Sequence, residues 1–145
     1  MKLPCNPYVL HKAALILALL AAAMPASASG CGDHLVGAAR LQTQGDGYTV
    51  VFAPRTWPIP VGRHFNMELV LCVPPGVATP ASVTVDADMP AHRHGMNYRT
   101  SVRALGHGKF VAEGLMLHMP GRWRFIFDVA GVKQTVRLTH EVQVE

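Results

Sequence analysis

The stretch WRFIFDV, residues 123–129, carries large apolar side chains at every second position. Trp123, Phe125, Phe127 and Val129 share one parity and form the most aromatic stripe in the chain. Successive side chains of a β-strand point to opposite faces of its sheet. The stretch therefore predicts a strand that packs one face against a core.

The same alternation of apolar and polar residues recurs on both sides of this stretch. Turn signals rich in Gly and Pro separate the candidate strands, which follow one another about every 8–12 residues. No helical periodicity is present beyond the N-terminal segment. The pattern predicts an all-β fold, an immunoglobulin-like antiparallel β-sandwich of about seven strands. The expected strands cover residues 38–44, 48–53, 64–73, 82–89, 100–105, 110–115 and 123–129, with a last one near the C-terminus.

The first 28 residues are typical of a secretory signal peptide. Lys2 and Lys12 precede or flank an apolar run at residues 13–23, and small residues suited to cleavage follow. An apolar run of this length is too short to span a bilayer, which takes about 20 residues. We therefore expect residues 1–28 to be removed and residues 29–145 to form one exported, periplasmic domain without a membrane helix.

Three cysteines are present, and Cys5 would leave with the signal peptide. In an oxidising compartment the remaining two, Cys31 and Cys72, most simply form one disulfide. Residues 28–31 also resemble a lipobox, in which Cys31 would carry a lipid that tethers the protein to the membrane. In that case Cys72 would be a lone thiol, and the sequence leaves both interpretations open.

Composition excludes several classes of function. Loss of Lys2 and Lys12 lowers the formal charge from +4 to +2, and no basic block is interleaved with aromatic residues. Nothing therefore points to nucleic acid. The chain has no G-x-S-x-G motif, and Cys72 is expected to be bonded or buried, so no nucleophile suggests an enzyme.

Soft metal donors are concentrated between residues 89 and 119. The segment holds four of the eight histidines and four of the seven methionines. These residues are His92, His94, His107, His118, Met89, Met96, Met116 and Met119. Imidazole and thioether together suit copper, and the thioether favours Cu(I).

Spacing narrows the candidate ligands. Pro90 predicts an extended segment after it, in which His92, His94 and Met96 would share one face. Met116 and His118 repeat this spacing, and Met119 follows directly. Zinc usually takes cysteinate, His and carboxylate, whereas this segment has no Cys and a single acid. Copper is therefore the expected metal.

Structural roles are also open for the same residue types. Met89 lies on an apolar parity and is expected in the core, while His107 is expected in solvent at a hairpin tip. Met116 and Met119 could equally fill gaps in the core. His92 and His94 could instead bond backbone carbonyls of their loop.

Three motifs resemble the YtkA-like and FixH-like exported bacterial domains. They are MPAHRHGM at residues 89–96, GHGKF at residues 106–110 and MPGRW at residues 119–123. The resemblance covers about residues 48–136 and implies a non-enzymatic β-sandwich linked to copper handling or cytochrome-oxidase assembly. It supports His92, His94 and Met96 as ligands, and Met119 less directly. The chain lacks the membrane anchor of the FixH pattern outside its signal peptide.

The expected function is thus binding or delivery of copper in the periplasm, together with a copper-handling or envelope protein partner. A structural or adaptor module of the cell envelope with no bound metal is the alternative. Such a module would dock its partner through a sheet edge or through the proline-rich loop at residues 55–62.

Overall fold

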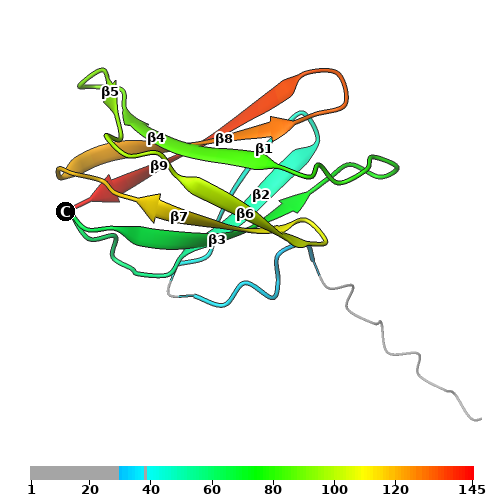
Figure 1. The fold of residues 1–145 in the computed structure, drawn as a ribbon, viewed down its shortest axis with the longest axis horizontal. Coiled ribbons are helices and arrows are strands. Elements are labelled where there is room, and N and C mark those ends of the chain that lie inside the picture. Colours follow the sequence, from blue (N-terminus) through cyan, green and yellow to red (C-terminus); the bar gives the residue numbers. More distant parts are fainter. Residues whose placement is uncertain (1–29, 38) are drawn as a thin grey trace, which may run out of the picture.

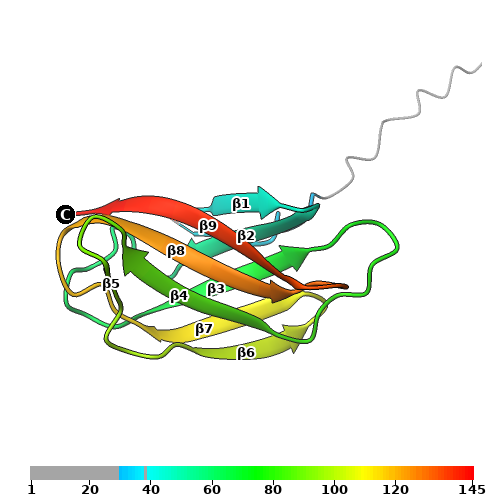
Figure 2. The same ribbon diagram turned by 90° about the horizontal axis from the view of Figure 1, so that it is seen from above.

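The computed structural model describes residues 30–37 and 39–145. The predicted signal peptide lies outside these residues. The described chain forms nine β-strands in two antiparallel sheets that pack face to face (Figures 1 and 2). The predicted all-β sandwich is confirmed.

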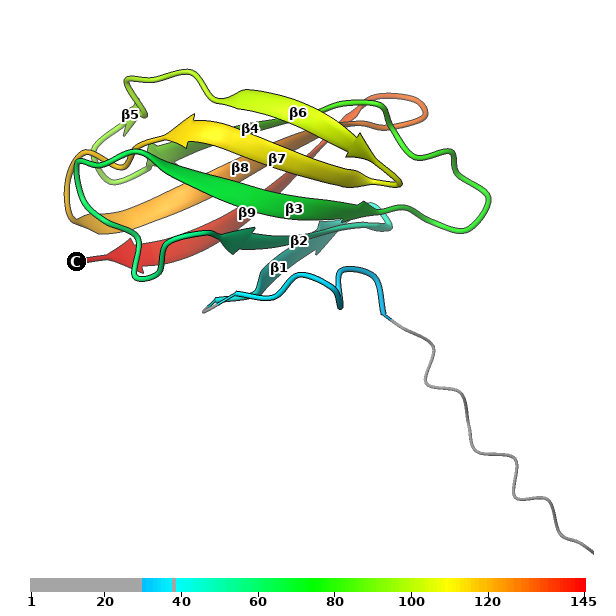
Figure 3. The same ribbon diagram turned by 60° about the horizontal axis from the view of Figure 1, so that its bottom comes forward.

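The larger sheet has the strand order β1-β2-β3-β7-β6 and faces the reader in Figure 3. Its strands are β1 (Leu41–Gly45), β2 (Tyr48–Pro54), β3 (Phe65–Cys72), β6 (Ser101–Gly106) and β7 (Lys109–Leu115). The smaller sheet has the order β5-β4-β8-β9. Its strands are β4 (Val83–Met89), β5 (His94–Gly95), β8 (Gly121–Ala130) and β9 (Thr135–Val144).

The aromatic stripe of β8 forms the centre of the core, as the alternation predicts. Trp123, Phe125, Phe127 and Val129 are all fully buried. Across the sandwich they meet Phe52 of β2, whose ring centroid lies 4.8 Å from that of Phe127. Aromatic rings at this separation contribute packing beyond the burial of their area.

The described residues contain nine strands and not the predicted seven or so. Strand β5 has no counterpart in the sequence prediction because it is only two residues long. It pairs with the end of β4 through Asp88 with Gly95 and Met89 with His94. A strand this short carries no period that a sequence pattern could reveal.

A β-bulge interrupts the alternation of β7 beside β3. Phe65 pairs with Leu115, but Met67 pairs with Ala112, so β7 carries one extra residue between these pairs. Gly114 adopts a φ of 83° there, and its N–H donates to Oδ1 of Asn66 at 3.4 Å. The extra residue lets both Ala112 and Leu115 face the core despite their odd spacing.

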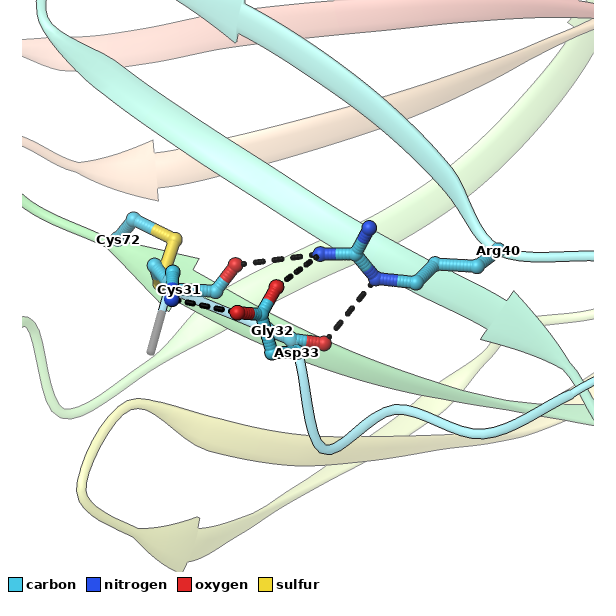
Figure 4. Close-up of polar contacts among 6 residues, drawn as sticks. Cys31, Gly32, Asp33, Arg40 and Cys72 are labelled. Carbon is cyan, nitrogen blue, oxygen red and sulfur yellow. Dashed lines mark hydrogen bonds and ion pairs between the residues drawn. A yellow bond between two sulfur atoms is a disulfide. The ribbon is translucent and has the colours of Figure 1, made fainter. Parts of the chain in front are cut away.

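A disulfide joins Cys31 to Cys72 at the end of β3 and confirms the predicted pairing. Figure 4 shows Arg40 holding the same N-terminal segment, where it donates to the carbonyls of Gly32 and Cys31 and to Asp33. A sulfur bonded in this way cannot also carry a lipid. Disulfides are typical of oxidising, extracytoplasmic compartments.

No helix in the described part of the chain is long and apolar enough to cross a membrane.

Candidate metal centre

Loops from both sheets meet at the end of the sandwich that carries β5 and the C-terminus (Figure 1). The β2–β3 loop is joined to the β7–β8 loop by a hydrogen bond from Gly62 N to Leu117 O at 2.8 Å. The segment after β5 is joined to β4 by a bond from Met96 N to Ala87 O at 3.0 Å. These backbone bonds fix the loops that hold the predicted ligands.

The chain after Pro90 forms a turn, so the predicted extended segment is wrong for residues 90–93. His92 N and Arg93 N both donate to Met89 O, at 3.0 and 2.9 Å, and Arg93 closes the turn with a φ of 56°. The fixed φ of proline suits the second position of a β-turn as well as it suits an extended strand. Here the hydrogen bonds from His92 and Arg93 to Met89 O stabilise the turn.

His94 begins β5 and points into the end of the sandwich. It pairs with the buried Met89, and residues paired across two strands place their side chains on the same face. The ring is half-buried, and its Nδ1 lies 3.3 Å from the carbonyl of Gly95. The pairing with β4 determines where the ring lies, and it therefore also determines the position of the other ring nitrogen, Nε2.

His118 reaches the same place from the β7–β8 loop. Its ring centroid lies 4.9 Å from that of His94, and both rings pack against the indole of Trp123. The indole N–H donates to Met119 O at 2.9 Å, which holds the loop down. Nδ1 of His118 is buried and has no hydrogen-bond partner among the described residues.

His92 lies outside this pair. Its ring centroid is 5.8 Å from that of His94, and the residue is exposed on the turn. Of the predicted histidine ligands, the structure therefore brings His94 and His118 together, and the exposed His92 lies beside His94.

The three predicted methionine ligands lie at the same end of the sandwich and are half-buried. Met96 and Met119 pack against the main hydrophobic core. Met116 lies between Leu115 and Leu117, which are both fully buried, so it falls on the opposite parity from these leucines. The bulge in β7 moves the core-facing positions from the parity of Ala112 to that of Leu115 and Leu117. A regular alternation does not predict this change.

The ring geometry agrees with a shared metal ion. With metal–nitrogen bonds of about 2.0–2.1 Å, two imidazoles on one tetrahedral ion have centroids about 5 Å apart. The described residues contain no group of three or more His, Cys, Asp or Glu that could hold a metal. The thioethers of Met96, Met116 and Met119 lie at the same end of the sandwich, and thioether is a donor that favours Cu(I).

The nearest carboxylate of β4 is engaged elsewhere. Asp88 pairs with Gly95 and so lies on the face of β4 opposite to Met89 and His94. It accepts two hydrogen bonds from Arg124, at 2.9 and 2.6 Å. This hydrogen bonding raises the pKa of Arg124, which keeps the guanidinium charged.

Trp123 is a residue of this site that the sequence pattern does not predict there. The alternation of residues 123–129 predicts Trp123 in the core, which is confirmed, since the side chain is fully buried. Trp123 ends the motif MPGRW, four residues after the predicted ligand Met119. That short spacing was the sequence feature that could have placed Trp123 at the site. Only the fold shows that both histidine rings rest on its indole.

No family model matches the chain, and no curated protein matches it. The proposed membership in the YtkA-like or FixH-like domains therefore stays a prediction. Among solved structures, the chain is similar to a DUF4426 family protein from Pseudomonas aeruginosa PAO1, at 14% sequence identity and a TM-score of 0.45. The match covers 73% of this chain and 96% of that chain.

Proposed function

We propose that this protein is an exported, periplasmic, non-enzymatic domain that binds copper and helps to deliver it. His94 and His118 form the centre of the site. The buried Nδ1 of His118, which lacks a hydrogen-bond partner among the described residues, is the observation that carries the proposal. An unsatisfied buried nitrogen costs about 1–3 kcal/mol, and a nearby metal site gives a reason for the ring to be kept there.

Neutral imidazole is a common metal ligand, and thioether favours Cu(I) over harder ions. His92, Met96, Met116 and Met119 are the further ligands that this end of the sandwich offers. Bound copper would be cargo, held by lone pairs of uncharged donors. The donor set proposed here, imidazole and thioether, therefore includes no carboxylate.

Competition for Cu(I) tests the proposal directly. The secreted, processed protein would be titrated against a coloured Cu(I) chelator beside the His94→Ala and His118→Ala variants. We expect each substitution to raise the Kd by at least the 10- to 100-fold that loss of a group supporting a ligand typically costs. His107→Ala is the matched control, because His107 is exposed at the tip of the β6–β7 hairpin.

The outcome that rejects the proposal is equal Cu(I) binding by the wild-type protein and both variants, or no binding by any of them. Thermal melting of each variant must accompany the titration. A variant that binds less copper but melts at the wild-type temperature has lost a ligand and not its fold.

The alternative, an adaptor module of the cell envelope, is favoured by one feature of β4. Strand β5 covers only Asp88 and Met89 of β4, and a groove of about 680 Å³ runs beside the remainder. The groove is lined by residues 84–88 and 95–100, and by Ile126, Asp128 and Arg137 of β8 and β9. An uncovered strand edge can accept an extended peptide. Copper-free protein that captures a defined partner from its own compartment would favour this function.

A further inference from the structure

Three histidine rings form a row from the surface into the end of the sandwich. His92 is exposed, and its ring centroid lies 5.8 Å from that of His94. The His94 ring in turn lies 4.9 Å from that of His118, whose Nδ1 is buried. His92 is thus the exposed member of the row, whereas His94 and His118 are both half-buried, and each ring centroid lies within 5.8 Å of the next.

We propose that His92 is the ligand through which copper enters and leaves the pair formed by His94 and His118. This inference rests on the proposed function. It divides the three histidines by role: the inner two set the affinity, and the outer one sets the rate of exchange.

The transfer is a sequence of ligand exchanges. A bond from copper to His92 forms as one bond from copper to the donor molecule breaks. Bonds to His94 and then to His118 form as the remaining bonds to the donor break. Each bond uses a lone pair of a neutral imidazole, so the copper keeps its oxidation state and no proton is transferred. Delivery runs through the same steps in reverse.

The turn at residues 90–93 gives His92 a fixed base for this role. Its own N–H and that of Arg93 both bond Met89 O, and Met89 is paired with His94 in the β4–β5 ladder. The position of His92 is therefore coupled to that of His94 through one residue. A partner that supplies or accepts copper would present soft donors, thioether, thiolate or imidazole, on an exposed segment that can approach the turn.

Stopped-flow transfer of Cu(I) from its bicinchoninate complex to the processed protein tests this division of roles. The rate of loss of chelator colour gives the exchange kinetics, and the end point gives the Kd. The variants are His92→Ala, His92→Met, His118→Ala and the control His107→Ala.

We expect His92→Ala to slow transfer about tenfold or more while changing the Kd less than about threefold, because a ligand used only during exchange changes the forward and reverse rates by the same factor. His92→Met should restore much of the rate, since a thioether can replace the outer imidazole. His118→Ala should instead raise the Kd, and His107→Ala should change neither quantity.

Two results would overturn the inference and leave the proposed function standing. If His92→Ala raises the Kd as much as His118→Ala does, His92 is a resident ligand. If it changes neither rate nor Kd, His92 takes no part in exchange. Absence of Cu(I) binding by the wild-type protein would instead reject the proposed function itself.

Discussion

The ring centroid of His94 lies 4.9 Å from that of His118, although His94 belongs to β5 and His118 to the β7–β8 loop. Both rings also contact Trp123, with centroid distances of 5.8 and 5.3 Å. The indole is therefore a built-in reporter for anything that binds between or beside the two imidazoles.

Copper bound at this pair should quench the fluorescence of Trp123. The chain has two tryptophans, so the measurement uses a Trp57→Phe background in which Trp123 is the single emitter. We expect saturable quenching on addition of Cu(I), with loss of the effect in His94→Ala and in His118→Ala. Quenching that persists in both variants would place the copper elsewhere.

Removal of the disulfide should lower the free energy of unfolding by about 4 kcal/mol, because Cys31 and Cys72 close a loop with a sequence separation of 41. Denaturant titration of the double variant Cys31→Ser, Cys72→Ser measures the loss. Cys72 ends β3 at the opposite end of the strand from Phe65, whose end of the sandwich carries the histidines. The copper affinity of the double variant should therefore equal that of the wild-type protein, and a lower affinity would contradict the separation of the two sites.

A side chain at position 121 should strain the region below His94. Gly121 has a φ of 129°, and a Cβ built there would lie 2.7 Å from Cε of Met89. We expect Gly121→Ala to cost about 1–3 kcal/mol of stability, which thermal melting would measure.

Gly76→Ala is the control for Gly121→Ala, because Gly76 also has a positive φ but has nothing within 4 Å of a built Cβ. Gly76→Ala should lower the stability less than Gly121→Ala does, because it strains only the backbone. Equal losses in the two variants would show that Met89 moves aside freely.

The ion pair between Asp128 and Arg137 should make stability depend on pH in the acid range. Arg137 donates two hydrogen bonds of 2.7 Å to Asp128, and this lowers the pKa of that carboxyl below its ordinary value of 3.8. The unfolded chain therefore binds a proton at a higher pH than the folded one does. The stabilisation is present above about pH 4 and is lost as the pH falls through the lower, folded pKa.

Melting temperatures of the wild-type protein and of Asp128→Asn, measured from about pH 2 to about pH 7 across the ordinary carboxyl pKa, check this expectation. The variant should be less stable at neutral pH, and the difference should shrink as the pH falls. A difference that stays constant with pH would show that the charge of Asp128 contributes nothing.

The strands were predictable from the sequence because apolar and polar residues alternate along them with a period of about two residues. Trp123, Phe125 and Phe127 alternate strictly, and this alternation is enough to assign β8 and the face it buries. The pairing of Cys31 with Cys72 was also predictable as one of two interpretations, because only two cysteines follow the predicted signal peptide.

The candidate site was predictable only in its composition. Residue types alone indicated soft donors in the segment that contains His92, His94 and His118. Which of them meet depends on two irregular features, the turn after Pro90 and the extra residue of β7, and neither follows a periodic sequence pattern. The bulge changes the faces of the β7 residues that follow it, because a shift of one residue moves a strand side chain to the other face. The turn likewise changes where the side chains of residues 92–94 point.

By itself, then, the sequence determined the class of fold, the residues of the core and the chemical character of one segment, since these follow from local alternation and composition. Only the tertiary structure decided which donors meet. It set His118 beside His94 on the indole of Trp123, and it left Met116 on the parity opposite to the buried leucines. The physical reason is that ring-to-ring distances depend on how two sheets pack and where their loops turn, and no local pattern encodes such long-range contacts.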